Sequence, residues 1–209
     1  MHARLGLRLC WIAASIFTFG HSANAQSNFY EGKTVSLIVG NAAGGGYDAA
    51  ARALARHMRK YIPGVANIVV KNMPGAGGLT AANYMYSVAE PDGLTFAVLS
   101  RSTPMQPTLG IAAAKYKAEN YTWLGTSSSY ADSAYFLVTM GSAPFKTVAD
   151  LKNPAIRPAL IGGLGAGGTD TDVVLVAKDV LKLNLNLIRG YKGSTDLSLA
   201  MERGEIDGR

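Results

Sequence analysis

The sequence predicts an α/β fold of two lobes with mostly parallel sheets, and three observations support this prediction. Short β-branched apolar runs alternate with segments of helical spacing. Glycine-rich turns connect a strand to a helix at 40–48 and again at 162–169. Between these units, the stretch 123–129 has the composition of a passage between domains. Turns of this kind lie at the carboxyl ends of parallel strands, where ligands bind, so we expect them to carry the function.

The first half of the chain begins with a strand and a helix. Val35–Val39 is a continuous apolar run, which is typical of a strand buried on both faces. Ala49–Tyr61 has helical spacing, and Asp48 stands where an N-cap belongs. The expected apolar stripe of this helix repeats every four residues: Ala50, Leu54, Met58 and Ile62. Its arginines, Arg52 among them, fall mostly off this stripe, and we expect them to be solvated.

Three further elements complete the expected first lobe. Pro63-Gly64 ends the helix, and Ile68–Lys71 predicts the second strand. Thr80–Val88 has helical character, and Thr95–Leu99 predicts a third strand. The segment 104–120 has no regular pattern, and we assign no element to it.

The second half repeats the same design after the passage between domains. Tyr135–Met140 predicts a strand, and Thr147 should cap a short helix that runs to Leu151. The remaining expected elements are strands at Ala159–Ile161 and Leu185–Ile188, helices at Thr171–Leu181 and Asp196–Met201, and the start of a further strand at Ile206.

The first glycine turn has the chemistry of an anion site. Gly44, Gly45 and Gly46 allow close approach, and the following helix N-terminus presents free backbone N–H groups. Each such terminus stabilises an anion by roughly 0.3–1 kcal/mol. Two termini that face one cleft would orient a carboxylate without a lysine or arginine. A tight strand-to-helix connection without any ligand explains a single loop equally well.

The sequence contains no complete motif for binding a cofactor or a metal ion. Gly163-x-Gly165-x-x-Gly168 matches the dinucleotide fingerprint, but that fingerprint also needs an acidic residue about 20 positions further on. The strand in question ends instead in Arg189. The sequence also has no Walker lysine motif, no G-x-S-x-G elbow, no H-E-x-x-H and no Cys/His metal spacing. We therefore expect binding by backbone and hydroxyl groups, with no cofactor and no enzyme activity.

Residues 1–25 have the features of a secretory signal peptide. Arg4 and Arg8 give a positive start, Leu9–Phe19 is apolar but too short to span a bilayer, and Ala23-Asn24-Ala25 is a cleavage signal. The single cysteine lies inside this segment, so the exported chain should have no disulfide. We expect a bacterial periplasmic protein. Its basic residues are dispersed, and the formal net charge of +6 does not indicate a nucleic-acid partner.

Five motifs in order resemble a known family. They are Tyr30-x-Gly-Lys-Thr-Val, Gly44-Gly-Gly-Tyr-Asp48, Asn72-Met-Pro-Gly-Ala-Gly-Gly78, Pro91-Asp-Gly93 and Ala200-Met-Glu-Arg-Gly-Glu-Ile-Asp-Gly208. This pattern is similar to the Bug or TctC family, the periplasmic substrate-binding proteins of tripartite tricarboxylate transport systems. The resemblance covers Phe29 to Gly208.

The resemblance implies a type II periplasmic-binding-protein clamshell that acts as a monomer and serves the membrane subunits of a transporter. Lobe 1 would span 26–125 and lobe 2 would span 126–209, with the hinge crossing near 124–130. A small organic carboxylate would bind between them. The ligand-binding positions that the family motifs imply are Gly44, Gly45, Gly46, Tyr47, Asp48, Gly75, Ala76, Gly77, Gly78 and Ser100 in lobe 1, and Gly165, Gly167, Gly168, Thr169, Tyr191, Gly193 and Ser194 in lobe 2.

The sequence departs from the family pattern in three respects, and the added carboxylates leave the identity of the ligand open. Asn41-Ala42-Ala43 stands where a proline often precedes the glycines, and Asp132 and Asp172 would place extra carboxylates near the cleft. These would disfavour a polyanion such as citrate, so a monocarboxylate or an amine-bearing ligand is equally compatible. Family members also extend roughly a hundred residues beyond Arg209. We therefore expect a truncated lobe 1 with exposed apolar surface.

Two alternatives to solute binding stay open at this point. One is an exported α/β enzyme that uses the glycine loops as an oxyanion site. Such an enzyme would need a nucleophile with a base in reach, and no histidine lies near an expected strand end. The other alternative is a non-functional truncated remnant.

Overall fold

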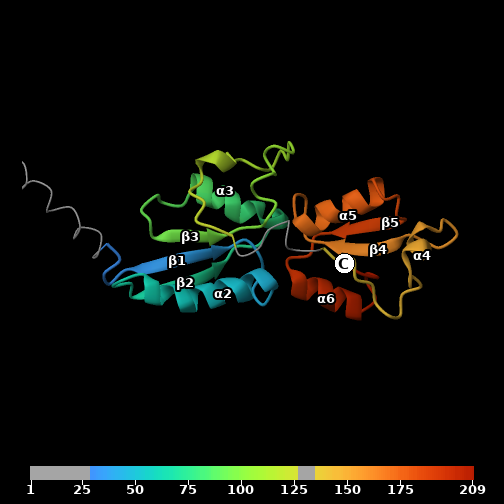
Figure 1. Cartoon of the computed structure of the whole chain (residues 1–209), viewed down its shortest axis with the longest axis horizontal. Coiled ribbons are helices and arrows are strands. Elements are labelled where there is room, and N and C mark those ends of the chain that lie inside the picture. Colours follow the sequence, from blue (N-terminus) through green and yellow to red (C-terminus); the bar gives the residue numbers. More distant parts are fainter. Residues whose placement is uncertain (1–28, 127–134) are drawn as a thin grey trace, which may run out of the picture.

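The computed structural model describes residues 29–126 and 135–209, which form two α/β halves side by side (Figure 1). We refer to the half that contains the first sheet as the first lobe and to the other half as the second lobe. The expected signal peptide at 1–25 and Asp132 lie outside the described residues. Most of the hinge stretch expected at 124–130 does so too, and the lobe boundary there stays a prediction.

The first lobe is built on a three-stranded parallel sheet in the order β2-β1-β3. The strands are β1 (Thr34–Val39), β2 (Asn67–Asn72) and β3 (Thr95–Val98). Figure 1 shows helices α2 (Gly46–Met58) and α3 (Leu79–Ser87) on opposite sides of this sheet. Short 3-10 turns lie at Arg59–Tyr61, Ala76–Gly78 and Ala118–Asn120.

The central strand β1 is buried on both faces, as its unbroken apolar run predicts. Leu37 is 1% exposed and Ile38, on the other face, is 2% exposed. The register pairs Val35 with Ile68 of β2 and Leu37 with Phe96 of β3. All three strands therefore end at one edge, where the glycine loops begin.

Helix α2 differs from the prediction in its start and in its buried face. It begins at Gly46 with Gly45 as its N-cap, so Asp48 lies inside the first turn rather than at the cap. Its buried residues are Asp48, Ala51 and Ala55, whereas Leu54 is 46% exposed. The expected stripe was wrong by about one residue because small alanines, not the larger leucine, allow the helix to approach the sheet.

The second lobe contains a two-stranded parallel sheet of β4 (Ala159–Gly163) and β5 (Leu185–Arg189). Figure 1 shows α5 (Thr169–Asp179) and α6 (Ser194–Glu202) on opposite sides of this sheet. The short helix α4 (Val148–Lys152) lies at the far end of the lobe. One hydrophobic cluster packs α4, α5 and the sheet around Ile161, and a second packs α6 around Leu197 and Ile206.

Two expected strands in the second lobe do not form. Tyr135–Met140 contributes only an isolated antiparallel bridge, between Thr139 and Gly208. The N–H of Met140 donates to the carbonyl of Asp207 at 2.8 Å, and Ile206 is buried without belonging to a strand. The two segments pair with each other over too few residues to build a ladder. An ion pair from Arg157 to Asp207 also holds the end of the chain beside β4.

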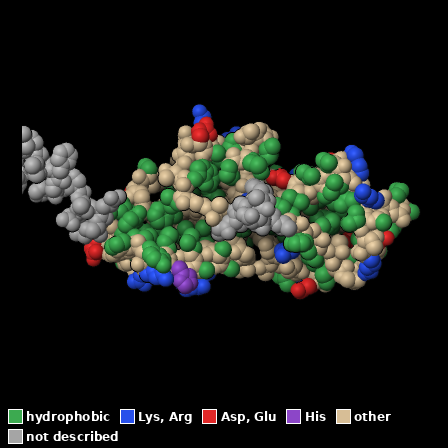
Figure 2. Space-filling model, viewed as in Figure 1, with side chains coloured by type: hydrophobic (Ala, Val, Ile, Leu, Met, Phe, Trp, Pro, Cys, Tyr) green, Lys and Arg blue, Asp and Glu red, His purple; other side chains and the backbone are tan. Residues whose placement is uncertain are grey.

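Large apolar side chains remain exposed on both lobes, and Figure 2 shows many of them on one face. In the first lobe they include Leu54, Tyr61 and Val88, and in the second lobe Val148, Val180 and Leu181. Across 29–126 and 135–209, no helix is both long enough and apolar enough to cross a membrane.

The N-cap of α4 provides a local stability test. Thr147 accepts a hydrogen bond from the Asp150 N–H, and the Asp150 carboxylate accepts one from the Thr147 N–H, which confirms the predicted cap. We predict that T147A lowers the free energy of unfolding by about 1 kcal/mol. T147S, which keeps the hydroxyl, should lower it much less in the same denaturant titration. Equal losses in the two variants would contradict the capping role.

Candidate functional site

A cavity of about 400 Å³ lies between the two lobes. The first lobe contributes the end of β1 and the glycine loop that follows β2, and the second lobe contributes the loops that follow β4 and β5. The lining residues are Gly40, Asn41, Gly75, Ala76, Gly77, Gly78, Leu164, Gly165, Ala166, Arg189, Gly190, Tyr191 and Lys192. All of these segments follow strand carboxyl ends, where an α/β sheet binds its ligands.

The glycine loop at 75–78 in the first lobe touches the glycine loop at 162–169 in the second lobe directly, backbone against backbone. A Cβ atom added to Gly77 would lie 2.6 Å from the Gly168 nitrogen, and one added to Gly165 would lie 2.8 Å from the Gly77 nitrogen. Gly77 also has a φ of +65°, which side chains with a Cβ rarely adopt. These glycines therefore allow the lobes to meet at the rim of the cavity.

A buried polar cluster forms a second contact between the lobes. The Gly167 carbonyl accepts hydrogen bonds from Ser102 Oγ, at 2.6 Å, and from Gln106 Nε2. Ser100 Oγ and Thr169 Oγ1 are 3.3 Å apart and share a hydrogen bond. Gln106 is fully buried, so its amide is committed to this contact. No pattern in the sequence indicated a role for Gln106, because it lies in the irregular segment 104–120.

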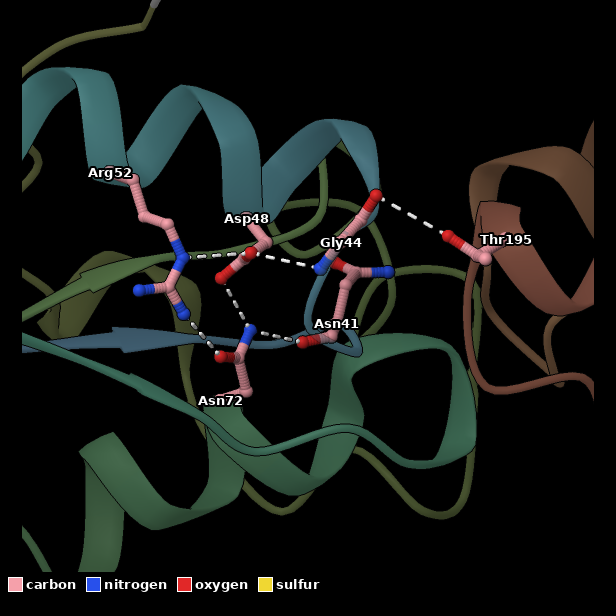
Figure 3. Close-up of polar contacts among 6 residues, drawn as sticks. All are labelled: Asn41, Gly44, Asp48, Arg52, Asn72 and Thr195. Atoms are coloured by element: carbon pink, nitrogen blue, oxygen red, sulfur yellow. Dashed lines mark hydrogen bonds and ion pairs between the residues drawn. The ribbon is translucent and has the colours of Figure 1, made fainter.

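A third contact joins the first glycine loop to α6. The Thr195 hydroxyl donates to the Gly44 carbonyl at 3.3 Å (Figure 3). Nearby, the Ala42 N–H donates to the Lys192 carbonyl at 3.4 Å. Both hydrogen bonds are long, so this side of the cleft is held weakly.

Asp48 fixes the shape of the first glycine loop from inside the first lobe. Its carboxylate accepts hydrogen bonds at 2.9 Å from the Gly44 N–H, from Arg52 Nε and from Asn72 Nδ2 (Figure 3). Asn72 Nδ2 also donates to the Asn41 carbonyl at 2.9 Å. One side chain thus joins the loop, helix α2 and the end of β2.

The same contacts determine the charge state of Asp48. The hydrogen bond from Arg52, followed by that from the Gly44 N–H, lowers the pKa of Asp48 to about 2. Asp48 is therefore a buried carboxylate paired with a cation, and it adds little net negative charge to the cleft. Arg52 makes this ion pair while its side chain stays 47% exposed, in agreement with the expectation that it is solvated.

The cavity wall is basic. Arg189 and Lys192 line it, and no carboxylate belongs to the lining within the described part of the chain. Asp172, which the sequence placed near the cleft, is not among the lining residues, and burial raises its pKa. Burial also raises the pKa of Asp170, whose carboxylate accepts a hydrogen bond from the Leu164 N–H at 2.7 Å.

The structure places only some of the predicted site residues on this wall. Those that line the cavity are Gly75, Ala76, Gly77, Gly78, Gly165 and Tyr191. Those that lie elsewhere, mostly at contacts between the lobes or within the Asp48 network, are Gly44, Gly45, Gly46, Tyr47, Asp48, Ser100, Gly167, Gly168, Thr169, Gly193 and Ser194. Lining residues that the sequence did not single out are Gly40, Asn41, Leu164, Ala166, Arg189, Gly190 and Lys192. Their common signal is a position at or just after a strand end.

The described residues hold no group of three or more His, Cys, Asp or Glu side chains arranged to bind a metal ion. His57, on α2, is exposed and does not belong to the cavity lining. The arrangement therefore offers hydrogen-bond donors and positive charge, which is the chemistry that holds an organic anion.

No family model matches the chain, but its sequence is similar to two curated proteins. It is 32% identical over 203 residues to the "UPF0065 protein in gbd 5′region" of Cupriavidus necator, covering 93% of this chain and 59% of that protein. It is 29% identical over 176 residues to BugT of Bordetella pertussis, covering 84% of this chain and 41% of BugT. The chain thus spans about three fifths and two fifths of the lengths of these relatives.

Solved structures share its fold. The periplasmic binding protein BugD matches 84% of this chain and 57% of its own length with a TM-score of 0.63 at 22% identity. MatC of Rhodopseudomonas palustris with bound malate matches 84% and 58%, with a TM-score of 0.63 at 21% identity. An R. palustris protein with adipate matches 84% and 59%, with a TM-score of 0.57 at 21% identity. The fold is that of a periplasmic binding protein. The relatives BugT and BugD agree with the resemblance to the Bug/TctC family that the sequence motifs carry.

The low pKa of Asp48 predicts how stability depends on pH. The folded-state pKa of about 2 lies below the ordinary value of 3.8, so the stabilisation is complete above about pH 5 and is lost as the pH falls towards 2. We predict that D48N costs about 1–3 kcal/mol at pH 7, because the Arg52 and Gly44 donors lose a charged acceptor. Denaturant titrations at several pH values should show the two proteins converging in stability below pH 4. A constant difference down to pH 2 would contradict this assignment.

The contact between Gly77 and Gly165 predicts that adding a single methyl group at this point pushes the lobes apart. We expect G165A to increase the radius of gyration in small-angle X-ray scattering, because its Cβ would meet the Gly77 nitrogen and the Ala76 backbone. Gly141 has open space around its Cβ position and no positive φ, so G141A is the matched control and should leave the radius unchanged. Identical scattering from G165A and the wild type would disprove the contact.

Proposed function

We propose that the chain is part of a periplasmic solute-binding protein that holds a small organic carboxylate between its two lobes. The carrying observation is the cavity itself, whose wall combines glycine backbone from both lobes with Arg189 and Lys192 and, among the described residues, includes no carboxylate. Cationic side chains and backbone N–H groups suit a carboxylate, and about 400 Å³ suits a small molecule.

The mechanism that follows is closure around the ligand. In the first lobe the cavity is bounded by backbone and Asn41, whereas both cations come from the second lobe. A carboxylate therefore gains its full set of contacts only when both lobes reach it. Such a ligand shifts the population towards the closed form by its difference in affinity for the two forms.

The structural neighbours support the proposed ligand class and the periplasmic location. Malate and adipate, which are bound in two of the structural neighbours, are both small dicarboxylates. BugD is a periplasmic binding protein, which agrees with the export signal expected at 1–25. Delivery of the ligand to the membrane subunits of a tripartite transporter, action as a monomer and the absence of catalysis complete the proposal.

The test is a thermal-shift and calorimetric screen of the purified chain. Malate, adipate, succinate and acetate are the anionic probes, and choline is the cationic control. We expect at least one acid to raise the melting temperature without being chemically converted. Turnover of an acid would favour the exported-enzyme alternative, and no shift with any acid would contradict carboxylate binding by this chain.

The two cations provide the matching mutations. R189Q and K192Q should each weaken binding of the best acid by about tenfold, since each removes a charged hydrogen bond worth about 1.5 kcal/mol. K182Q changes a lysine that lies outside the cavity lining and is the charge-matched control. Calorimetric titration measures all three variants. Equal affinity in R189Q, K192Q and K182Q would contradict a role for Arg189 and Lys192 in binding the acid.

A further inference from the structure

Asn41 occupies a special position in the cavity. It follows Gly40 at the end of β1, the central strand of the first sheet, and it lines the cavity wall. The residue is 6% exposed, and its Oδ1 is buried without a hydrogen bond from any described residue. An unpaired buried acceptor is costly and uncommon in folded proteins, so this atom calls for a partner.

The backbone of Asn41 is fixed, whereas its side chain is not. Asn72, itself held by Asp48, donates to the Asn41 carbonyl at 2.9 Å and anchors the start of the loop. In Figure 3 the side-chain amide of Asn41 extends away from Asn72, towards the side where α6 contributes Thr195. Oδ1 makes no hydrogen bond that a turn about the Cβ–Cγ bond would break, and this torsion is soft. The amide can therefore turn its oxygen towards a ligand.

Most of the other polar groups on the wall differ from Asn41 in chemistry. Arg189 and Lys192 have only donors in their side chains, the backbone N–H groups of the glycine loops are donors as well, and the Tyr191 hydroxyl can donate or accept. These groups suit the oxygens of a carboxylate. A side-chain amide oxygen suits the opposite partner, an O–H or N–H group on the ligand.

We propose that Asn41 sets the specificity of the cavity by accepting a hydrogen bond from a hydroxyl or ammonium group beside the ligand's carboxylate. This inference rests on the proposed function. It narrows the ligand to a hydroxy or amino acid rather than a plain carboxylic acid. The Asp48–Asn72 pair acts behind Asn41 as a positioning device, because it holds the backbone from which the amide projects.

The experiment uses three probes that differ in one substituent. Succinate, L-malate and L-aspartate share a four-carbon dicarboxylate chain and have a hydrogen, a hydroxyl and an ammonium group at the same carbon. Calorimetric titration of the wild-type chain should show malate, aspartate or both binding about threefold to tenfold more tightly than succinate, as expected for one additional hydrogen bond. N41L, of similar size but without polar atoms, should bring the affinities of all three acids to within about twofold.

A second substitution separates acceptor chemistry from packing. N41D keeps acceptor oxygens and adds negative charge, so it should raise the ratio of aspartate to succinate affinity while weakening malate. Thermal unfolding checks that N41L and N41D fold, and N41A is a smaller substitute for N41L. Equal wild-type affinity for the three acids, or an unchanged preference in the folded N41L or N41A variant, would overturn the inference alone. Failure of the wild type to bind any of the three would overturn the proposed function together with it.

Discussion

The contact between the glycine loops determines most of what the cleft can do. Gly77 of the first lobe lies against Gly165 and Gly168 of the second, at distances that leave no room for a Cβ atom. Backbone groups from both lobes therefore meet at the cavity rim. Close approach of this kind requires rigid loops, because a mobile glycine segment would lose more entropy on closing than a few weak contacts return.

The Asp48 network makes the neighbouring loop of the first lobe rigid, the one at 40–46, whose Gly40 lies beside Gly78 of the Gly77 loop. Glycine loops are flexible in isolation, but this loop is tied to α2 and β2 because one carboxylate accepts hydrogen bonds from three donors. A buried carboxylate would normally be unfavourable beside an anion site. The ion pair with Arg52 offsets its charge, so the loop is stabilised without repelling an anionic ligand.

The strands and glycine loops could be predicted from the sequence, because β-branched runs and glycine positions are local signals. Val35–Val39 and Leu185–Ile188 fall within β1 and β5. Asn41 and Gln106 could not be predicted, since their roles depend on partners distant in the chain. The ion pair of Arg52 with Asp48 spans one helical turn and is local. Spacing alone also could not separate the neighbouring stripes of α2, where Ala51 and Ala55 rather than Ala50 and Leu54 face the sheet.

The division of chemistry between the lobes connects these features. The second lobe contributes the cations of the cavity, while the first contributes backbone groups and Asn41. A carboxylate could be attracted by the second lobe before closure, since charge acts over about 8 Å at physiological salt. Under the proposed function, the ligand would reach the first lobe only at contact distance, where hydrogen-bond geometry discriminates between similar acids. The proposal thus assigns attraction and selection to different lobes, and closure would be the step at which both act on the same ligand.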